Sequence, residues 1–521
     1  MANRGTLPRT VRGFRDVSPN LNELRWRIIN AASAVYRSYG FEHWDTPVVE
    51  YAECLGKYLP DSDTIDQGVY SFRNPEREPI LDTDGREMRD NDNNVLMENH
   101  FLSLRYDLTA PLARKYASDL WDDRHSAKDR KVGMPLFRRF QYGPVYRFEA
   151  KLDPGRFREF WQLDFDTVGV ADVTCDAEVC CILSDALEAI GLARGTYEVR
   201  VNNRKLHAGL FQKLGLEEQG IGGDIMRVLD KYDKIGRDGI AGELGPGRTD
   251  SSGARIPGLA LPDSAIASLL DYVELSSVEG DRSTMLARLE PLLGQTPAGR
   301  EGLDELTLIH QTLAGLGYGD DRVRFDPSIA RGLAYYTGPV FEAVSTLEVR
   351  DEAGLLRRFG AISGGGRYDN LVEKLLHVPV PATGASIGVD RLAELLSLQG
   401  EGKGMRGPVL ITVMDRPRMA EYQALAHQLR AAGIETEVYY GGEKRLKGQF
   451  AYADARGCPV AIIAGGNEFE KGTVSIKDLY LGKEYAKNAE NRETWLAANP
   501  AQVEVPVTDM VETVKGMLAR S

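Results

Sequence analysis

The sequence predicts an α+β protein in which helices flank an antiparallel-sheet core, with a helical insertion and a C-terminal α/β domain. Residues 135–168 have the pattern of strand, turn and strand, with a charged face and an apolar face that alternate with a period of two. Residues 195–317 are mostly helical in pattern, with glycine- and proline-rich breaks near 242–257. After a glycine-rich connector at 399–408, strands alternate with helices, which indicates a small, mainly parallel α/β domain.

The length of 521 residues exceeds what one ordinary hydrophobic core supports, so we expect roughly two to four domains. The changes of pattern along the chain place the boundaries between them. The expected domains are residues 1–195 and 319–400 for the core, 196–318 for the insertion, and 405–521 for the C-terminal domain with its tail.

The first clear element is a helix over residues 19–39. Ser18 is placed to cap it, Pro19 suits its first turn, and Gly40 follows as a stop. Apolar residues recur at helical spacing and give the helix one apolar face. These residues are Leu21, Leu24, Ile28, Ala32, Val35 and Tyr39.

Further elements follow from short patterns along the chain. An extended run at 41–49 is interrupted by Pro47, which favours an edge or interface strand. A polar stretch between Tyr70 and Leu104 indicates a long hairpin with its tip near 82–94. The remaining predicted elements are strands at 322–325, 340–344, 358–363, 409–414, 434–440, 459–464 and 473–479, and helices at 419–432 and 446–456.

Composition excludes several classes of protein. The apolar fraction of 42% and the charged fraction of 27% are typical of a soluble globular chain. No apolar run approaches the ~18 residues that cross a bilayer, and the N-terminus has no apolar signal region, so we expect a cytoplasmic protein without a membrane partner. The five cysteines form no C-x-x-C pair, and we expect no structural metal or disulfide.

The charge distribution is uneven. A net charge of −13 argues against non-specific coating of nucleic acid. Residues 131–160 nevertheless hold seven basic side chains (Lys131, Arg138, Arg139, Arg147, Lys151, Arg156, Arg158) against three acidic ones (Glu149, Asp153, Glu159). The alternatives are a solvated basic face and a surface for phosphates.

The predicted hairpin carries residues that could bind phosphate. Arg147 and Arg156 flank a turn that ends in Gly155, and guanidinium forks bind phosphate oxygens bidentately. Glu149 could meet an adenine amine or a metal. We predict that the even positions after the turn share one face, and that Phe157, Trp161, Leu163 and Phe165 lie on the other. The first set is Arg156, Arg158, Gln162, Asp164 and Asp166. Alone, this pattern is a weak indication of phosphate binding, because charged sheet faces are usually only solvated.

A resemblance adds specificity. The segments YRFE at 146–149 and GRFREF at 155–160 resemble motif 2 of class II aminoacyl-tRNA synthetases. GASIGVDRL at 384–392 resembles their motif 3, and the helix at 19–39 with the strand ending near Pro47 is similar to motif 1, a dimer-interface element. The resemblance implies a class II synthetase core and a homodimer.

Four further segments resemble histidyl-tRNA synthetases in particular. They are LRYDLT at 104–109, DKYDKIG at 230–236, ARGLAYYTG at 330–338 and SGGGRYD at 363–369. The resemblance covers nearly the whole chain, except the hairpin tip near 82–99 and about the last forty residues.

The resemblance implies a role for each matching residue. Histidine would be bound by Asp107, Leu108, Thr109, Gln162, Asp166, Tyr335 and Tyr336, with Asp166 and the tyrosines on the imidazole. ATP would be bound by Arg147, Glu149, Arg156, Gln162 and Arg391, and Arg147 and Arg331 would be catalytic. A neutral imidazole has one donor and one acceptor, so a carboxylate and a phenol can read both ends. In isolation, two adjacent tyrosines would more often be core packing.

The implied reaction has two steps. Histidine carboxylate attacks the α-phosphate of ATP, with Mg²⁺ balancing the pyrophosphate charge, and the adenylate then acylates tRNA(His). The C-terminal domain would bind the anticodon.

Two departures and two rivals qualify this prediction. The family usually has an acidic residue where this chain has Ala334, and the turn at 150–155 is less basic than expected. One rival is the regulatory paralogue of ATP phosphoribosyltransferase, a histidine sensor that lacks the terminal domain. The other is the synthetase-like domain of a stress kinase, which is disfavoured because no kinase segment is present.

Overall fold

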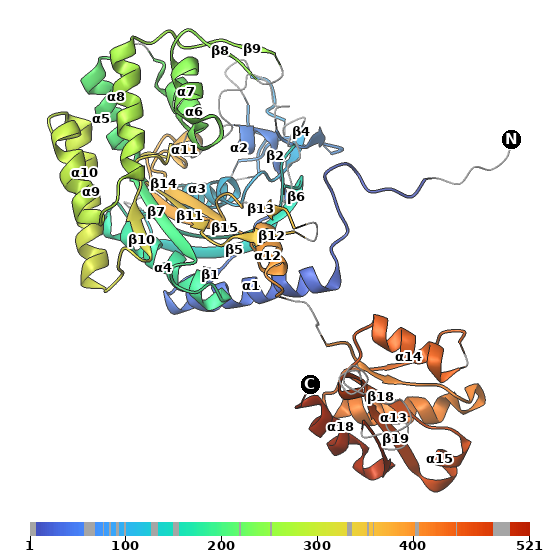
Figure 1. The fold of residues 1–521 in the computed structure, drawn as a ribbon. Coiled ribbons are helices and arrows are strands. Elements are labelled where there is room, and N and C mark those ends of the chain that lie inside the picture. Colours follow the sequence, from blue (N-terminus) through green and yellow to red (C-terminus); the bar gives the residue numbers. More distant parts are fainter. Residues whose placement is uncertain are drawn as a thin grey trace. The chain divides into compact units, whose positions relative to one another are not determined.

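The structure is a computed structural model, and its chain divides into two compact units, Met1–Glu401 and Gly402–Ser521 (Figure 1). Each unit is described by itself. The described residues are 7–56, 68–76, 78–82, 85–89, 93–97, 101–126, 134–148, 156–217, 220–250, 253–330, 336–351, 354–357, 359–401, 406–443, 445–482 and 501–520.

An eight-stranded sheet forms the centre of the first unit, in the order β1-β5-β6-β15-β14-β11-β7-β10. All neighbours from β5 to β7 pair antiparallel, whereas β1 and β10 add parallel edges. The predicted antiparallel-sheet core is therefore confirmed. The strands are β1 (Glu42–His43), β5 (Phe137–Tyr146), β6 (Glu159–Val168), β7 (Tyr197–Asn203), β10 (Val323–Phe325), β11 (Pro339–Ser345), β14 (Ser363–Arg367) and β15 (Ala382–Gly388).

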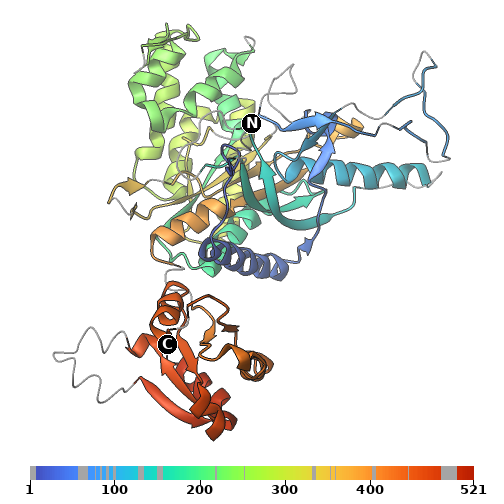
Figure 2. The ribbon, with the colours of Figure 1, turned by 90° about the vertical axis from the view of Figure 1, so that its right-hand side faces the viewer.

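Three helices pack on one face of this sheet, α1 (Pro19–Ser38), α4 (Thr174–Ile190) and α12 (Val389–Leu398) (Figures 1 and 2). The predicted start of α1 is confirmed, since the Ser18 hydroxyl accepts a hydrogen bond from the Leu21 N–H. Residues of α1 and α4 form one core with the odd positions of β6. The odd positions Leu163 and Phe165 are fully buried there, which leaves the even positions for the opposite face.

The opposite face carries α3 (Thr109–Ser126), whose apolar side chains pack with α2 (Ala52–Gly56) and α11 (Glu373–Leu376). Beside it lies a small antiparallel sheet in the order β2-β4-β3, with β2 (Val49–Tyr51), β3 (Ser71–Arg73) and β4 (Phe101–Leu104). The described residues between β3 and β4 make isolated antiparallel bridges, Pro79 with Met97 and Arg89 with Val95 among them.

The described residues between 204 and 315 form a group of helices with one short strand pair, β8 (Arg248–Thr249) and β9 (Arg255–Ile256), inside the predicted glycine- and proline-rich break (Figure 1). β7 lies in the range that the sequence assigns to the insertion, yet it pairs with β11 and β10 in the main sheet. The helices are α5 (Arg204–Leu214), α6 (Gly222–Leu229), α7 (Tyr232–Leu244), α8 (Asp263–Glu274), α9 (Arg282–Leu293) and α10 (Pro297–Gly315).

The strand predicted over 358–363 is wrong in position. A short pair, β12 (Val349–Arg350) with β13 (Leu356–Arg357), precedes it, and the sheet strand β14 begins only at Ser363. β14 contains three consecutive glycines, which are depleted in ordinary strands. Gly365 and Gly366 are required here, because a Cβ at Gly365 would lie 2.2 Å from the carbonyl oxygen of Gly384 on β15 and one at Gly366 would lie 2.7 Å from the Tyr336 ring.

The second unit has a five-stranded sheet in the order β17-β16-β18-β19-β20. β16 pairs parallel with β17 and β18, whereas β19 and β20 add antiparallel strands. The predicted strands and helices of this unit are found, and the structure adds α15, β20 and α18. The elements are β16 (Val409–Ile411), β17 (Thr436–Val438), β18 (Val460–Ile463), β19 (Thr473–Asp478), β20 (Gln502–Pro506), α13 (Met419–Ala431), α14 (Leu446–Ala455), α15 (Gly466–Lys471) and α18 (Met510–Leu518). Within the described residues of both units, no helix combines the length and apolarity that crossing a membrane requires.

Candidate active site

A cavity of about 350 Å³ opens on the polar face of the central strands β6, β14 and β15. It brings together most of the residues that the sequence analysis singled out. These are Asp107, Thr109, Arg147, Arg156, Gln162, Asp166, Tyr336 and Arg391. Leu108 is fully buried and does not line the cavity, and its carbonyl accepts a hydrogen bond from Arg139 Nη2 at 2.8 Å. Glu149, Arg331, Ala334 and Tyr335 lie outside the described residues.

The floor of the cavity follows from the alternation along β6. Gln162, Asp164 and Asp166 all line it, and their side chains are at least nine-tenths buried. The predicted alternation fails just before the strand, because Phe157 lines the cavity whereas Arg158 packs over Phe148. Regular pairing of β6 with β5 begins only at Glu159. Side chains before that residue therefore need not alternate between the two faces of the sheet.

Asp166 is held from two sides. Arg139 on β5 lies opposite it in register, and its Nη2 is 3.1 Å from Asp166 Oδ2. The Tyr368 hydroxyl donates to Asp166 Oδ1 at 2.5 Å. Burial raises the pKa of Asp166, and that of Asp164 to about 7, against the opposing effect of Arg139. Three carboxylates therefore line the floor, including Asp107, and the buried arginines Arg139 and Arg105 interact with Asp164.

Glycines on β14 and β15 make room for these side chains. A Cβ at Gly384, which faces Asp166 in register, would lie 2.3 Å from Asp166 Oδ1. A Cβ at Gly366 would lie 2.7 Å from the ring of Tyr336. The glycine-rich segments therefore build the cavity by letting side chains lie directly over the backbone.

Arg147 is fixed at the wall of the cavity, directly after the end of β5. Its Nε donates to the Tyr106 carbonyl at 3.1 Å, and its guanidinium lies over the Tyr106 ring, 4.3 Å from the centroid. Its backbone N–H donates to the Arg158 carbonyl at 2.9 Å, which extends the β5–β6 ladder to this position. The guanidinium is therefore oriented before any ligand arrives.

A second cationic group comes from the first turn of α12. Arg391 lines the cavity and donates to the Ala361 carbonyl at 2.5 Å. The neighbouring Asp390 anchors this turn to the sheet and to α1, since it accepts from the Trp161 N–H at 2.5 Å and from Arg25 at 2.8 Å. Anions are favoured at such a helix start, because its backbone N–H groups point outward.

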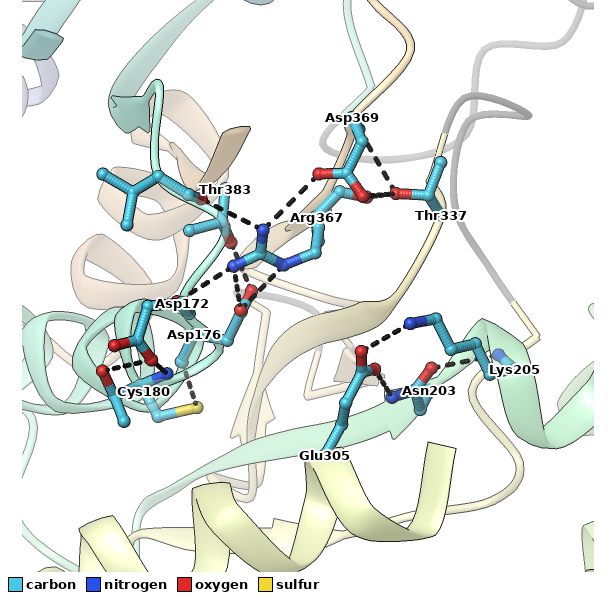
Figure 3. Close-up of polar contacts among 12 residues, drawn as sticks. Asp172, Asp176, Cys180, Asn203, Lys205, Glu305, Thr337, Arg367, Asp369 and Thr383 are labelled. Atoms are coloured by element: carbon cyan, nitrogen blue, oxygen red, sulfur yellow. Dashed lines mark hydrogen bonds and ion pairs between the residues drawn. The ribbon is translucent and has the colours of Figure 1, made fainter. Parts of the chain in front are cut away.

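Figure 3 shows how the chain after residue 335 is tied to β14. Arg367 lies between Asp176 and Asp369, and both its Nε and Nη2 donate to the buried Asp176 carboxylate, at 2.9 and 2.5 Å. The Thr337 hydroxyl donates to Asp369 at 2.8 Å, and the Thr337 N–H donates to the Arg367 carbonyl at 2.9 Å. Tyr336 is thereby held beside the cavity.

Comparisons with known proteins agree with this geometry. A family model described as histidyl-tRNA synthetase matches residues 78–392. The chain belongs to the histidyl-tRNA synthetase family. A histidine–tRNA ligase of Ruegeria pomeroyi is 45% identical over 98% of this chain and 97% of that protein, and one of Paracoccus denitrificans is 44% identical over 98% and 97%.

Solved structures give the same result. A histidyl-tRNA synthetase from Nostoc sp. PCC 7120 has a TM-score of 0.67 at 27% identity, covering 98% of this chain and 99% of that chain. An ATP phosphoribosyltransferase regulatory subunit/histidyl-tRNA synthetase from Bacillus halodurans C has a TM-score of 0.61 at 23% identity, over 86% and 97%, which shows the fold alone. A second family model, described as an anticodon binding domain, matches residues 409–517. The regulatory paralogue considered above lacks that domain, so this match favours the family's ligases.

Sequence reasoning missed several side chains of the histidyl-tRNA synthetase site. Arg139 and Tyr368 were not assigned to it, although both contact Asp166, and neither were Ser386 and Asp390. Asp164 was placed on the correct face but given no role. Strand register could have indicated Arg139 and Ser386, because Arg139 faces Asp166 and Ser386 faces Asp164 across neighbouring strands.

Proposed function

We propose that this protein is a histidine–tRNA ligase, which activates L-histidine with ATP to histidyl-adenylate and pyrophosphate and then transfers histidine to tRNA(His). Family membership supports the reaction. The observation that carries the assignment of the site is the division of charge in the cavity. Carboxylates occupy its floor, and Arg147, Arg156 and Arg391 line its walls.

The floor suits a histidine molecule. Asp107, Thr109 and Gln162 would bind the α-ammonium group, and Asp166 with Tyr336 would bind the imidazole. Three buried carboxylates outnumber the buried arginines Arg139 and Arg105 that act on them, which favours a cationic ligand. A pocket built to hydrogen-bond its substrate rejects analogues that lack the matching groups by roughly 10⁴-fold, so no separate editing site is required.

The walls suit ATP. Arg147 would contact the α-phosphate and the reacting carboxylate, with Arg156 and Arg391 on the remainder of the nucleotide. Arg331 as second catalytic cation, Glu149 on the adenine and Tyr335 on the imidazole stay predictions, because these residues lie outside the described chain. Histidine carboxylate is already ionised, so displacement of pyrophosphate needs no protein base. The arginines would act by stabilising the charge that builds up on the α-phosphate.

Mg²⁺ would accompany the triphosphate. Among the described residues, no group of three or more His, Cys, Asp or Glu side chains is placed to hold a metal ion. The described residues therefore supply no dedicated protein cage, and we assign no step to the ion. Mg²⁺ commonly keeps several waters and binds substrate phosphates, so its ligands here would be mainly phosphate oxygens.

The rest of the chain would serve the tRNA and the assembly. Residues 405–521 would bind the anticodon, and residues 1–195 with 319–400 would form the catalytic core around the insertion at 196–318. We further propose a homodimer built through α1 and the extended run after it, and a cytoplasmic location.

Amino-acid-dependent exchange of pyrophosphate into ATP tests the first half-reaction, with each of the twenty amino acids in turn. We expect exchange with histidine alone, followed by charging of one isoacceptor class in total tRNA. Histidine binding without exchange would contradict the proposal and favour a histidine sensor. Exchange without charging would contradict the transfer step only.

A further inference from the structure

The Gln162 amide can face the cavity with either of its two ends. An amide presents either a carbonyl oxygen or two N–H donors, and the two ends are nearly the same size. Only the carbonyl oxygen can accept a hydrogen bond from an ammonium group. Gln162 Oε1 is buried and has no hydrogen-bond partner within the described chain, while Gln162 lines the cavity.

Two neighbours fix which end faces the cavity. Gln162 Nε2 donates to the Ser386 hydroxyl oxygen on β15 at 2.8 Å. Ser386 faces Asp164 across the β6–β15 register, and the interaction of its hydroxyl with the Asp164 carboxylate lowers the pKa of Asp164. A serine hydroxyl has a single proton. When that proton goes to an ionised Asp164, the oxygen of Ser386 can only accept, and it accepts from the amide nitrogen.

We propose that Asp164 and Ser386 are positioning residues that set the polarity of Gln162, so that its carbonyl oxygen meets the α-ammonium group of the substrate. This inference rests on the proposed function, which supplies the ammonium group. It adds a requirement that Asp164 be ionised when histidine binds. A protonated Asp164 would donate a hydrogen bond to the Ser386 oxygen. The Ser386 hydroxyl would then donate its own hydrogen bond to the amide oxygen of Gln162. The amide would therefore turn its N–H groups toward the ammonium group.

The charges around Asp164 place this change near neutral pH. Burial raises the pKa of Asp164 to about 7; Asp166 and Asp107 add to the increase, whereas Arg139 and the Ser386 hydrogen bond oppose it. Arg105 and Tyr36, from the two sides of β6, also interact with this carboxylate. Above pH 7 Asp164 is ionised and the amide oxygen faces the substrate. Below pH 7 that orientation is progressively lost, so affinity for histidine falls as the pH falls.

The experiment measures kcat and KM for histidine by pyrophosphate exchange between pH 6 and 8.5. Ser386→Ala is expected to raise KM about 10- to 100-fold at pH 8, the scale of a hydrogen bond to a charged group, with kcat changed less than about threefold. Asp164→Asn is the conservative rescue, because its amide oxygen still accepts the Ser386 proton. At pH 8 its KM should rise less than that of Ser386→Ala, because one floor carboxylate is neutralised but the amide orientation of Gln162 is kept.

The pH profile separates positioning from a structural role. The ratio of wild-type KM to Asp164→Asn KM should rise as the pH falls below 7, because Asn does not titrate. Titration of the substrate imidazole is common to both proteins and cancels in the ratio. A ratio that stays constant from pH 6 to 8.5 would overturn the inference.

Two substrate analogues provide a second readout that does not depend on catalysis. Histidinol keeps the ammonium group, and its inhibition constant should rise with Ser386→Ala. Imidazolepropionate lacks the ammonium group, and its inhibition constant should not change. Equal losses for both analogues would indicate a general disturbance of the cavity and contradict the inference.

A matched control tests for effects of removing a buried serine. Ser184 is fully buried in α4, where its hydroxyl donates to the Cys180 carbonyl of the same helix. Ser184→Ala should leave KM for histidine unchanged across the pH range. A change in KM like that of Ser386→Ala would overturn the inference. If the wild type shows no histidine-dependent exchange, the proposed function fails. If the wild type shows histidine-dependent exchange and Ser386→Ala has the same KM for histidine as the wild type, only the positioning role fails.

Discussion

Asp166 and Gly384 face each other across β6 and β15, and the carboxylate of Asp166 occupies the space that a Cβ at position 384 would need. That Cβ would lie 2.3 Å from Asp166 Oδ1 and 2.3 Å from the Phe165 carbonyl oxygen, so the Asp166 side chain would have to rotate away and the Phe165 carbonyl could move only with its strand. The position of the carboxylate that would bind imidazole is therefore set by a glycine on the neighbouring strand.

Gly384→Ala should displace Asp166 and overpack the sheet. We expect the free energy of unfolding to fall by about 1–3 kcal/mol and KM for histidine to rise more than KM for ATP. Denaturant unfolding and pyrophosphate exchange measure the two effects. Gly364→Ala is the matched control for stability, because its Cβ would meet only the Phe341 carbonyl oxygen at 3.9 Å. Equal stability losses for both variants would contradict the argument.

Arg147→Ala should lower kcat for adenylate formation about 10²- to 10³-fold, because it would remove the donor that we propose for the charge on the α-phosphate. Arg147→Lys should recover only part of this rate, since an ammonium cannot reproduce the bidentate fork. Single-turnover adenylate formation measures the rate. A lysine variant as fast as the wild type would show that charge alone is required.

Tyr368→Phe removes the hydroxyl that donates to Asp166 and keeps the buried ring. That hydrogen bond lowers the pKa of Asp166 against the effect of burial, so its loss makes the carboxylate easier to protonate. We expect KM for histidine to rise several-fold, and the increase to be larger at pH 6 than at pH 8. An increase that is independent of pH would contradict this explanation.

His207 provides a test of stability against pH. Burial, reinforced by the nearby Arg204, lowers the pKa of His207 to about 3. The folded value is depressed, so its contribution to stability is complete above the unfolded value of about 6.5 and is lost as the pH falls. The free energy of unfolding should fall by about 1.4 kcal/mol per pH unit between roughly pH 6 and 3 from this group. His207→Phe, which keeps a ring against Tyr272, should reduce that slope.

The sequence predicted the fold best where periodicity was uninterrupted. The alternation after Glu159 placed Gln162, Asp164 and Asp166 on one face, and the apolar stripe of α1 placed that helix in the core. It failed at β14, because glycines weaken a strand pattern even where close packing requires them. The sequence pattern also placed β7 in the insertion, because the sequence of a single strand beside many helices does not indicate which sheet the strand joins.

The site was predicted from resemblance more than from physical pattern. Position-by-position matching identified eight of the residues that line the cavity, but it assigned no role to Arg139 or Ser386. Both act through contacts with residues far away in the sequence, Arg139 on Asp166 and Ser386 on Gln162. Pairing of strands brings such groups together, and no local spacing encodes it.

A crystal structure with a non-hydrolysable histidyl-adenylate analogue tests the central claim most directly. We predict the imidazole within hydrogen-bond distance of Asp166, the ammonium group on Gln162 Oε1, and the phosphate mimic on the guanidinium of Arg147. An analogue bound with its imidazole away from Asp166, or with Arg147 turned away from the phosphate position, would contradict it.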